Sequence, residues 1–295
     1  MKEKVLITGA RGSVATKLST SLVEDGYETC YLTTQKNPTE LNHFHWDYTT
    51  SYIDTNALHN VSHIIHLSGL NIAKPWTKKN KKIMYESRIH TSQLLFRTCK
   101  ELNIQPKTFI SASAMGVYKS SIKEREEFDD TGNDWMSKLC VDWEKSADDF
   151  KSLGSRVVKL RFSLILDKNS GILKNILMGF KFYTGVIFGN GTEPFPWIHI
   201  NDVTRFIKYA ITNDSINEAY NLVTNNDTNY GFISNIKKTL YQYSVLIYIP
   251  KPLVKLIFGE QSKIILNEIS LSCKRMNDTG FKCQINTIEK ALKQR

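Results

Sequence analysis

Residues 5–18 read VLITGARGSVATKL, and the predicted fold depends on the turn inside this stretch. A short apolar run leads into Gly9 and Gly12, and residues 13–23 continue with the spacing of a helix. Glycines let such a turn tighten, so that backbone N–H groups at the positive end of the helix can approach a pyrophosphate. Ala15 stands at the usual third glycine position, where its small side chain still permits close packing. The stretch therefore predicts a dinucleotide-binding site.

Short apolar segments alternate with helical patterns after this turn. Strands are predicted at residues 28–33, 44–48, 63–67, 107–112 and 156–160, and helices at residues 78–102, 135–153 and 172–181. This alternation is typical of α/β proteins with a parallel sheet, whose ligands gather at the carboxyl ends of the strands. The predicted fold class is a Rossmann-type doubly wound parallel sheet with a smaller C-terminal substrate lobe.

The second half of the chain is less regular, and no linker separates it as an independent domain. Residues 185–196 are rich in Gly and Pro and are expected to be mostly loop, and residues 225–229 (NNDTN) are expected to form a turn. The expected division is a dinucleotide-binding domain at residues 1–165 with 198–224 returning to it, and a smaller C-terminal substrate lobe at residues 166–197 and 225–295.

Length and composition exclude several classes of protein. The chain has 295 residues, of which 41% are hydrophobic and 11% aromatic, as is typical of a globular protein. Apolar runs stay short of about eighteen residues, and the N-terminus turns polar early, so we expect a cytoplasmic protein with no membrane span. The five cysteines are odd in number and lack a C-x-x-C pair, which predicts reduced thiols and no metal site.

The formal net charge of +10 raises the question of a nucleic-acid partner, because basic surfaces attract phosphate backbones. Most lysines are dispersed, and the one dense cluster lies at residues 74–82. No nucleic-acid-binding module surrounds this cluster, so we expect no such partner. Cations in a first helical turn oppose the helix dipole. Two alternatives stay open for the cluster: a solvated helix start, or a surface that faces an anionic substrate group.

The residues after the second predicted strand bear on the choice between NAD and NADP. A carboxylate at this point binds the ribose 2′-hydroxyl of NAD and repels the 2′-phosphate of NADP. Residues 33–36 read TTQK, without an acid, and Arg11 and Lys36 are two cations suited to a 2′-phosphate. Both are also ordinary surface residue types, but we expect NADP to be preferred over NAD. The candidate cofactor-binding residues in these segments are Gly9, Arg11, Gly12, Ser13, Val14, Lys36, Leu67, Ser68 and Gly69.

Segments along essentially the whole chain carry a resemblance to known proteins. They read TGARGSVATKL, IIHLSGLNIAKPW, ESRIHTSQLL, FISASAMGVY, SKLCVDWE, LRFSLIL, GNGTEPFPWIHINDV and CKRMNDTGFKCQINTIEKAL. The chain resembles the extended, atypical branch of the short-chain dehydrogenase/reductase superfamily. More narrowly, its last segments are similar to NAD(P)-dependent epimerase/dehydratase-like proteins of the kind sometimes labelled SulA-like cell-division inhibitors. Nothing in these residues supports the cell-division label.

The resemblance implies chemistry at particular positions. In the superfamily a serine holds the substrate carbonyl or hydroxyl, a tyrosine transfers a proton, and a lysine four residues later lowers the tyrosine pKa and binds the nicotinamide ribose. Ser113 matches the serine, and Lys138 matches the lysine, which is thus both a catalytic and a cofactor-binding candidate. Asp134 stands at the tyrosine position, and Ser87 lies where an asparagine is usual.

The missing tyrosine leaves three interpretations open. Tyr118 supplies a phenol from another direction, Asp134 or another group acts in a different proton transfer, or the cofactor binds without hydride chemistry. A carboxyl group that is ionised at pH 7 cannot donate a proton as a phenol does. The spacing of Asp134 and Lys138 is also that of a surface ion pair on a helix.

Arg161, Trp197 and His199 are the candidate substrate-cleft residues. Arg161 ends a predicted strand, where a cation could bind an anionic substrate or pair with a structural carboxylate. In similar proteins the segment that holds Trp197 and His199 shapes the substrate cleft and braces the fold, and an imidazole there could also act as an acid or base. Asp202 is expected to cap the helix that follows.

The sequence thus predicts an NADP-binding oxidoreductase or epimerase-like enzyme that acts on a small polar substrate. Ser113, Lys138 and Tyr118 are its candidate catalytic residues. The alternative is an NADP-binding regulatory protein without turnover, which the missing tyrosine favours. The resemblance also implies a homodimer that pairs through the helices at residues 78–102 and 135–153.

Overall fold

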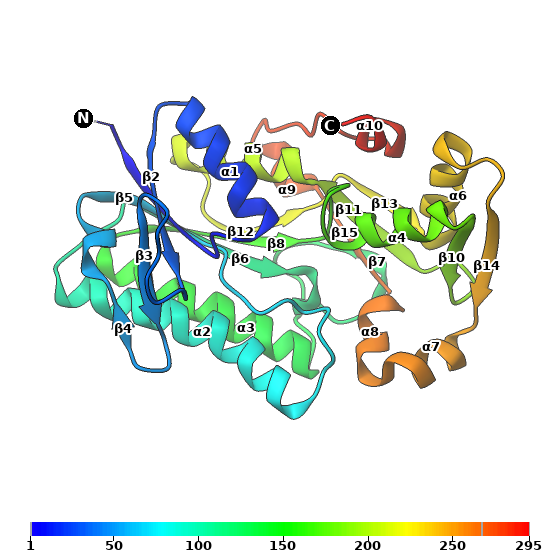
Figure 1. Cartoon of the computed structure of the whole chain (residues 1–295), viewed down its shortest axis with the longest axis horizontal. Helices are drawn as coiled ribbons and strands as arrows, with labels where there is room; N and C mark the ends of the chain where they lie inside the picture. Colours follow the sequence, from blue (N-terminus) through cyan, green and yellow to red (C-terminus); the bar gives the residue numbers. More distant parts are fainter. Residues whose placement is uncertain (1, 267, 295) are drawn as a thin grey trace. The chain divides into compact units, whose positions relative to one another are not determined.

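The computed structural model describes residues 2–266 and 268–294, which form two compact units (Figure 1). The first unit consists of the described residues up to 117 together with residues 133–161 and 204–220. The second unit consists of residues 118–132, 162–203 and the described residues from 221 onward. Residues 118–132 therefore lie in the second unit, although the sequence assigned them to the dinucleotide-binding domain.

An eight-stranded sheet organises the first unit. Its strands in spatial order are β12 (Glu218–Leu222), β8 (Arg156–Phe162), β6 (Thr108–Ala114), β5 (Val61–His66), β1 (Lys4–Thr8), β2 (Glu28–Thr33), β3 (His43–Asp47) and β4 (Tyr52–Ile53). The pairs β1–β2, β1–β5, β2–β3 and β5–β6 are parallel, and β3–β4 is antiparallel. From β1 the chain first forms β2, β3 and β4 on one side and then β5, β6, β8 and β12 on the other. The direction of strand addition therefore reverses at β1, which is a topological switch point.

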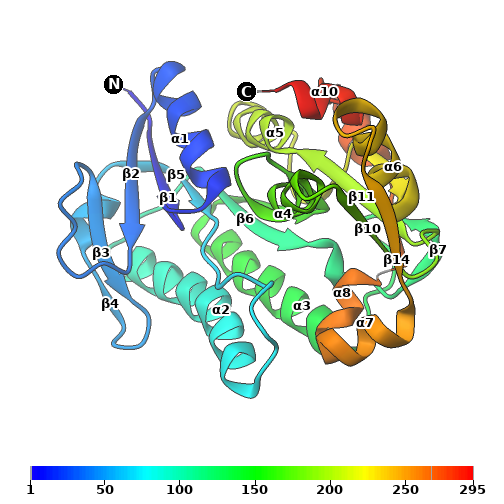
Figure 2. The same cartoon turned by 45° about the vertical axis from the view of Figure 1, so that its right-hand side comes forward.

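Helices cover both faces of this sheet. Figures 1 and 2 show α1 (Ser13–Glu24) and α5 (Ile200–Thr212) on one face, and α2 (Lys78–Glu101) and α3 (Trp135–Asp148) on the other. The short 3-10 turns are η1 (Thr55–Leu58), η2 (Met115–Val117) and η3 (Asp149–Leu153). A mostly parallel sheet with helices on both faces confirms the predicted Rossmann-type fold class.

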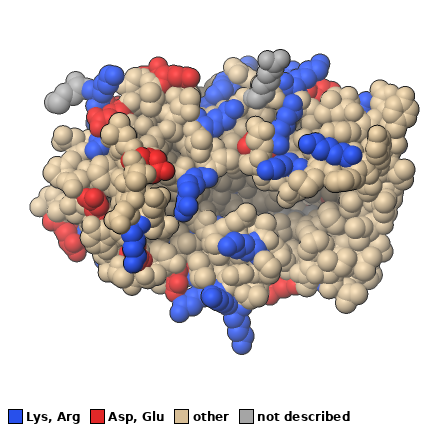
Figure 3. Space-filling view, in the orientation of Figure 1, with Lys and Arg blue, Asp and Glu red and all other residues tan. Residues whose placement is uncertain are grey.

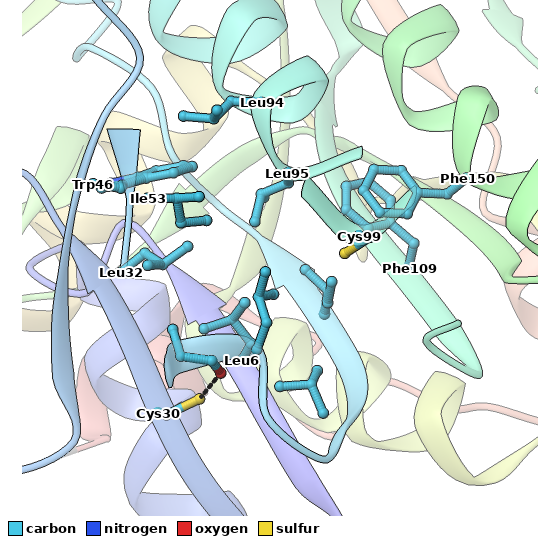
Figure 4. Packing of buried hydrophobic residues seen from close by; sticks show 14 of the residues in the cluster. Leu6, Cys30, Leu32, Trp46, Ile53, Leu94, Leu95, Cys99, Phe109 and Phe150 are labelled. Atoms are coloured by element: carbon cyan, nitrogen blue, oxygen red, sulfur yellow. Dashed lines mark hydrogen bonds between the residues drawn. The ribbon is translucent and has the colours of Figure 1, made fainter. Parts of the chain in front are cut away.

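The main apolar core of the first unit lies between the sheet and helices α2 and α3 (Figure 4). Leu6 of β1 is fully buried, as is Leu95 of α2. Phe109 and Phe150 stack with their ring centroids 3.7 Å apart. Each fully buried side chain of this size contributes about 1.5–3 kcal/mol to folding.

Three of the five cysteine thiols are buried inside the protein. All five cysteines are free, and Cys30, Cys99 and Cys140 are buried. Burial raises the pKa of each of these three thiols to about 12. They are therefore protonated at neutral pH, the form in which a thiol is a poor nucleophile.

Three small sheets and a set of helices build the second unit. The sheets are β9 (Leu164–Leu166), β11 (Pro194–His199) and β13 (Asn225–Thr228); β10 (Thr184–Phe188) and β14 (Val245–Ile249); and β7 (Ser121–Arg125) and β15 (Ile269–Leu271). The helices are α4 (Gly171–Lys181), α6 (Asn229–Leu240), α7 (Lys251–Phe258), η4 (Gly259–Gln261), α8 (Ser262–Ile265), α9 (Lys274–Asp278) and α10 (Ile288–Lys293). In the described residues, no helix is long and apolar enough to cross a membrane.

Two sequence predictions for the second unit were wrong. Residues 185–196, expected to be mostly loop, contain most of β10 and the start of β11, and the expected turn at residues 225–229 contains β13. The amide side chain of Asn226 explains part of this difference. It donates to Leu271 O over 2.8 Å and accepts from Leu271 N over 3.0 Å, so a polar side chain ties this strand to β15.

Basic side chains do not gather in one patch on the face that Figure 3 shows. Lys and Arg side chains are scattered over it, with acidic groups interspersed. The positive net charge is therefore spread over this face.

Candidate functional site

The glycine turn joins β1 to α1 and lies against the segment that follows β5. Gly9 has a φ of +73°, a left-handed conformation that favours glycine, and a Cβ there would lie 2.8 Å from Leu67 O. Gly12 donates its N–H to Gly9 O over 2.8 Å and is the N-cap of α1. No side chain caps this helix, and its first turn holds no acid. The first N–H groups of α1 are thus available to an anionic ligand.

Thr8 and His66 fix the position of residues 67 and 68, which follow β5. Thr8 Oγ1 accepts from Leu67 N and Ser68 N, both over 3.1 Å, and lies 3.0 Å from His66 Nδ1. With two N–H donors already on its oxygen, the hydroxyl donates its own hydrogen to Nδ1. The imidazole hydrogen then sits on Nε2, which lies 3.3 Å from Arg88 O. Burial lowers the pKa of His66 to about 4, so the ring is neutral at pH 7.

The end of β2 presents no carboxylate to a bound nucleotide. The strand ends at Thr33, whose Oγ1 accepts from Gln35 N over 3.2 Å. Arg11 in the glycine turn and Lys36 after β2 are both exposed. The two predicted cofactor cations thus belong to the loops that follow neighbouring parallel strands.

Ser113 lies at the end of β6 and is buried. Its hydroxyl donates to Glu144 Oε1 over 2.6 Å. Arg161 holds the same carboxylate with Nε 2.7 Å from Oε1 and Nη2 2.8 Å from Oε2. Because the single hydroxyl hydrogen points at a carboxylate, Ser113 Oγ is left as a hydrogen-bond acceptor. Arg161, predicted to face the substrate or a structural carboxylate, has the second of these partners.

Asp134 and Lys138 do not form the surface ion pair that their spacing suggested. The Asp134 carboxylate accepts from Ser137 N over 2.9 Å and so caps the N-terminus of α3. Lys138 is exposed in the first turn of that helix. A helix that begins at Trp135 has unpaired N–H groups beside Asp134, and the carboxylate turns to them.

Tyr118 belongs to the second unit, where its phenol serves the fold. The ring is 2% exposed, and the hydroxyl donates to Asn221 Oδ1 over 2.7 Å. Asn221 is itself fully buried and donates through Nδ2 to Arg125 O over 3.0 Å. This arrangement gives the phenolic hydrogen a fixed structural partner.

Trp197 and His199 of β11 are also buried in the second unit. Trp197 has no exposed surface and donates its indole N–H to Asp227 Oδ2 over 2.7 Å. His199 Nδ1 accepts from Asn201 N over 3.2 Å. Asp202, expected to cap the next helix, lies inside α5, which begins at Ile200, and accepts instead from Ile285 N over 2.9 Å.

The structure brings together only part of the predicted site. The glycine turn and residues 67–69 are adjacent, and Ser113 is linked to Arg161 through Glu144. Tyr118, Trp197 and His199 lie in the second unit. Sequence reasoning missed Glu144, His66 and Asn221, because nothing in their local sequence distinguishes them. In the described residues, no group of three or more His, Cys, Asp or Glu side chains is placed to hold a metal ion.

Comparison with known proteins defines the class to which this fold and turn belong. Residues 5–222 match the NAD dependent epimerase/dehydratase family, and residues 249–294 match a domain of unknown function, DUF1731. The chain therefore belongs to the NAD dependent epimerase/dehydratase family, as the resemblance indicated.

The sequence and the fold of this chain are similar to those of individual relatives over nearly its whole length. An epimerase family protein of Staphylococcus aureus (strain N315) is 27% identical over 298 residues, which cover 98% of each chain. The crystal structure of human epimerase family protein SDR39U1 (isoform 2) with NADPH is 24% identical, covers 98% of each chain and has a TM-score of 0.88. A nucleoside-diphosphate sugar epimerase from Corynebacterium glutamicum is 25% identical over 99% of this chain and 57% of that chain, with a TM-score of 0.77.

Proposed function

We propose that this chain is an NADP(H)-binding oxidoreductase or epimerase-like enzyme that acts on a small polar substrate. The glycine turn carries the proposal. Gly9 admits the close approach of residues 67–68, and the N-terminus of α1 is left without a side-chain cap. Such a helix end suits the pyrophosphate of a dinucleotide. The human relative that shares this fold was crystallised with NADPH, which agrees with the proposal.

The choice of NADP over NAD is supported by charge. Residues 34–39, directly after β2, hold no acid at the point where a carboxylate would repel a 2′-phosphate. Arg11 and Lys36 are exposed cations on the loops after β1 and β2, and β1 and β2 are neighbouring parallel strands. A 2′-phosphate between those loops would meet both.

In this proposal four of the predicted site residues have roles at the cofactor or the substrate. The first N–H groups of α1, at Ser13 and Val14, hold the pyrophosphate, and Lys138 holds the nicotinamide ribose. Ser113 orients the substrate as a hydrogen-bond acceptor, because Glu144 takes its hydroxyl hydrogen.

A regulatory protein that binds NADP without turnover is the second candidate, and specific contacts favour it. The carboxylate of Asp134 caps α3, the phenol of Tyr118 donates to Asn221, and the hydroxyl of Ser113 donates to Glu144. Asp134 and Tyr118, which were considered for proton transfer, and Ser113, which was expected to orient the substrate, thus all have structural partners.

Titration calorimetry with NADPH and NADH tests cofactor binding. We expect NADPH to bind more tightly, and Arg11→Ala to weaken NADPH binding by about tenfold or more while NADH binding hardly changes, because a charge-assisted hydrogen bond to phosphate is lost. Arg97→Ala is the matched control, since Arg97 is exposed near the C-terminal end of α2, away from the carboxyl edge of the sheet. Absence of binding by either nucleotide would refute the proposal.

Isotope transfer distinguishes the two candidates. The protein is incubated with NADPH deuterated at C4 on either face and with a metabolite extract, and products are examined by mass spectrometry. Deuterium in a small molecule, lost with Lys138→Ala, supports the enzyme. Binding of NADPH without transfer from either face, and without conversion of any compound of the extract when NADP⁺ is supplied instead, supports the regulatory protein, because an epimerase returns the hydride that it takes.

A further inference from the structure

Arg88 of α2 is a buried cation next to the segment that follows β5. Its side chain is 9% exposed. Nη2 donates to Leu70 O over 3.0 Å, and Nη1 donates to Met84 O over 3.0 Å. The guanidinium carbon lies 4.9 Å from the centroid of the Trp143 ring, a cation–π distance.

Arg88 differs from most buried arginines in its partners. Among the described residues, no Asp or Glu forms an ion pair with it; its partners are two carbonyl groups and an aromatic face. Burial lowers the pKa of its guanidinium to about 10, so the group still carries its charge at pH 7. A buried charge without a counterion is costly, and proteins usually pair it with a group of opposite sign.

Two close approaches connect this cation to the glycine turn. A Cβ on Gly69 would lie 2.8 Å from Arg88 Cζ, so the Gly69 backbone lies directly against the guanidinium. A Cβ on Gly9 would lie 2.8 Å from Leu67 O, so the same segment also touches the turn. Residues 67–70 are therefore a layer of backbone that contacts the turn at Leu67 and contacts Arg88 at Gly69, which has no side chain.

We propose that Arg88 is a positioning residue for the dinucleotide: its buried charge raises the positive potential at the glycine turn, and its hydrogen bond to Leu70 holds residues 67–70 against that turn. The counterion that Arg88 lacks within the protein is then the pyrophosphate of the bound cofactor. This inference rests on the proposed function.

The arrangement suits an electrostatic role across the backbone layer. Water is largely excluded around a side chain this buried, so its field is screened less than that of a surface cation. The neutral state of His66, whose Nε2 lies 3.3 Å from Arg88 O, adds no second charge beside it. Arg88 is thus the fixed cation on this side of the turn, whereas Arg11 is exposed and screened by salt.

Two substitutions separate charge from shape. Arg88→Lys keeps the charge but loses the planar fork, and Arg88→Gln keeps an N–H donor but loses the charge. Each variant is titrated with NADPH at several salt concentrations, after its thermal unfolding has been compared with that of the wild type. Arg97→Gln, on the exposed surface of the same helix, is the matched control.

We expect Arg88→Gln to weaken NADPH binding on the order of tenfold and to lower its salt dependence, with Arg88→Lys close to the wild type, because a charge in a poorly screened site is removed only in the former. Equal losses in both variants would mean that only the shape of Arg88 matters, and unchanged binding in Arg88→Gln would mean that it has no role; either result overturns the inference. Failure of the wild type to bind NADPH would instead refute the proposed function, and the inference with it.

Discussion

Two buried arginines of the first unit, Arg161 and Arg88, have opposite surroundings. Arg161 holds the carboxylate of Glu144 through two hydrogen bonds of 2.7 and 2.8 Å. Arg88 has carbonyl groups and a tryptophan face instead, and forms no ion pair within the described chain. A cation that is neutralised within the protein, such as Arg161, has a structural role. A cation without a counterion in the described chain, such as Arg88, is suited to an anionic ligand.

Removal of Glu144 tests the structural role of its ion pair with Arg161, and it has the largest expected effect on the free energy of unfolding. Glu144→Ala removes the buried carboxylate that pairs with the Arg161 guanidinium and accepts from the Ser113 hydroxyl. We expect a loss of about 3–5 kcal/mol in the free energy of unfolding, measured by urea denaturation.

Two further variants control the Glu144 experiment. Glu86→Ala removes a helix glutamate that pairs at 3.7 Å with Lys82, whose side chain is exposed, and it should cost less than about 1 kcal/mol. The pair Glu144→Leu and Arg161→Met should recover much of the lost stability, because it removes both buried charges. A small effect of Glu144→Ala alone would contradict the structural role.

Acid tests the surroundings of Arg88, because His66, whose Nε2 lies 3.3 Å from Arg88 O, resists protonation in the folded chain. The pKa of His66 falls from 6.5 to about 4 on folding, owing first to burial. Between these values the unfolded chain binds a proton that the folded chain does not, so this contribution to stability is full above pH 6.5 and is lost as the pH falls toward 4. We expect about 2 kcal/mol to be lost between pH 7 and pH 5.

Urea unfolding at pH 7 and pH 5 checks this expectation. His66→Gln should flatten the pH dependence by that amount, whereas His59→Gln, at an exposed histidine, should leave it unchanged. An identical pH dependence in all three proteins would mean that His66 takes up its proton without cost.

Gly69→Ala gives the smallest expected change and acts on Arg88 alone. The new Cβ would lie 2.8 Å from Cζ and 3.0 Å from both terminal nitrogens, which the carbonyl groups hold in place. We expect a loss of about 1–2 kcal/mol in stability together with weaker NADPH binding. Combined with Arg88→Lys, whose side chain is slimmer, the same substitution should cost less than in the wild type. Additive losses would contradict contact between the two residues.

Sequence reasoning recovered the features that are encoded locally. The glycine turn and the alternation of strands and helices depend on residues close in the chain, and both are present. The β6 end with Ser113 was also located. The family could be recognised before any contact was known, because the segments that carry the resemblance, above all the last ones along the chain, are continuous in the sequence.

Contacts between distant residues could not be derived in this way. Ser113 donates a hydrogen bond to Glu144, which lies 31 residues further along the chain, and Tyr118 donates one to Asn221, which lies 103 residues further. Strand register and helix rotation bring these residues together. Asp134 shows a nearer limit. Its spacing to Lys138 is right for an ion pair, but the residue lies at the start of the helix, where free N–H groups compete for the carboxylate.

The first unit is interrupted twice along the chain, and this has a consequence for synthesis. Its edge strand β12 begins at Glu218, and Arg156 of β8 donates to Ala210 O and Ile216 O over 2.8 and 2.7 Å. At roughly 5–20 residues per second, a ribosome needs on the order of tens of seconds to deliver these partners. Until then the sheet has an open edge at β8, so the nascent chain is most exposed to aggregation, and most dependent on chaperones, before residue 220 emerges.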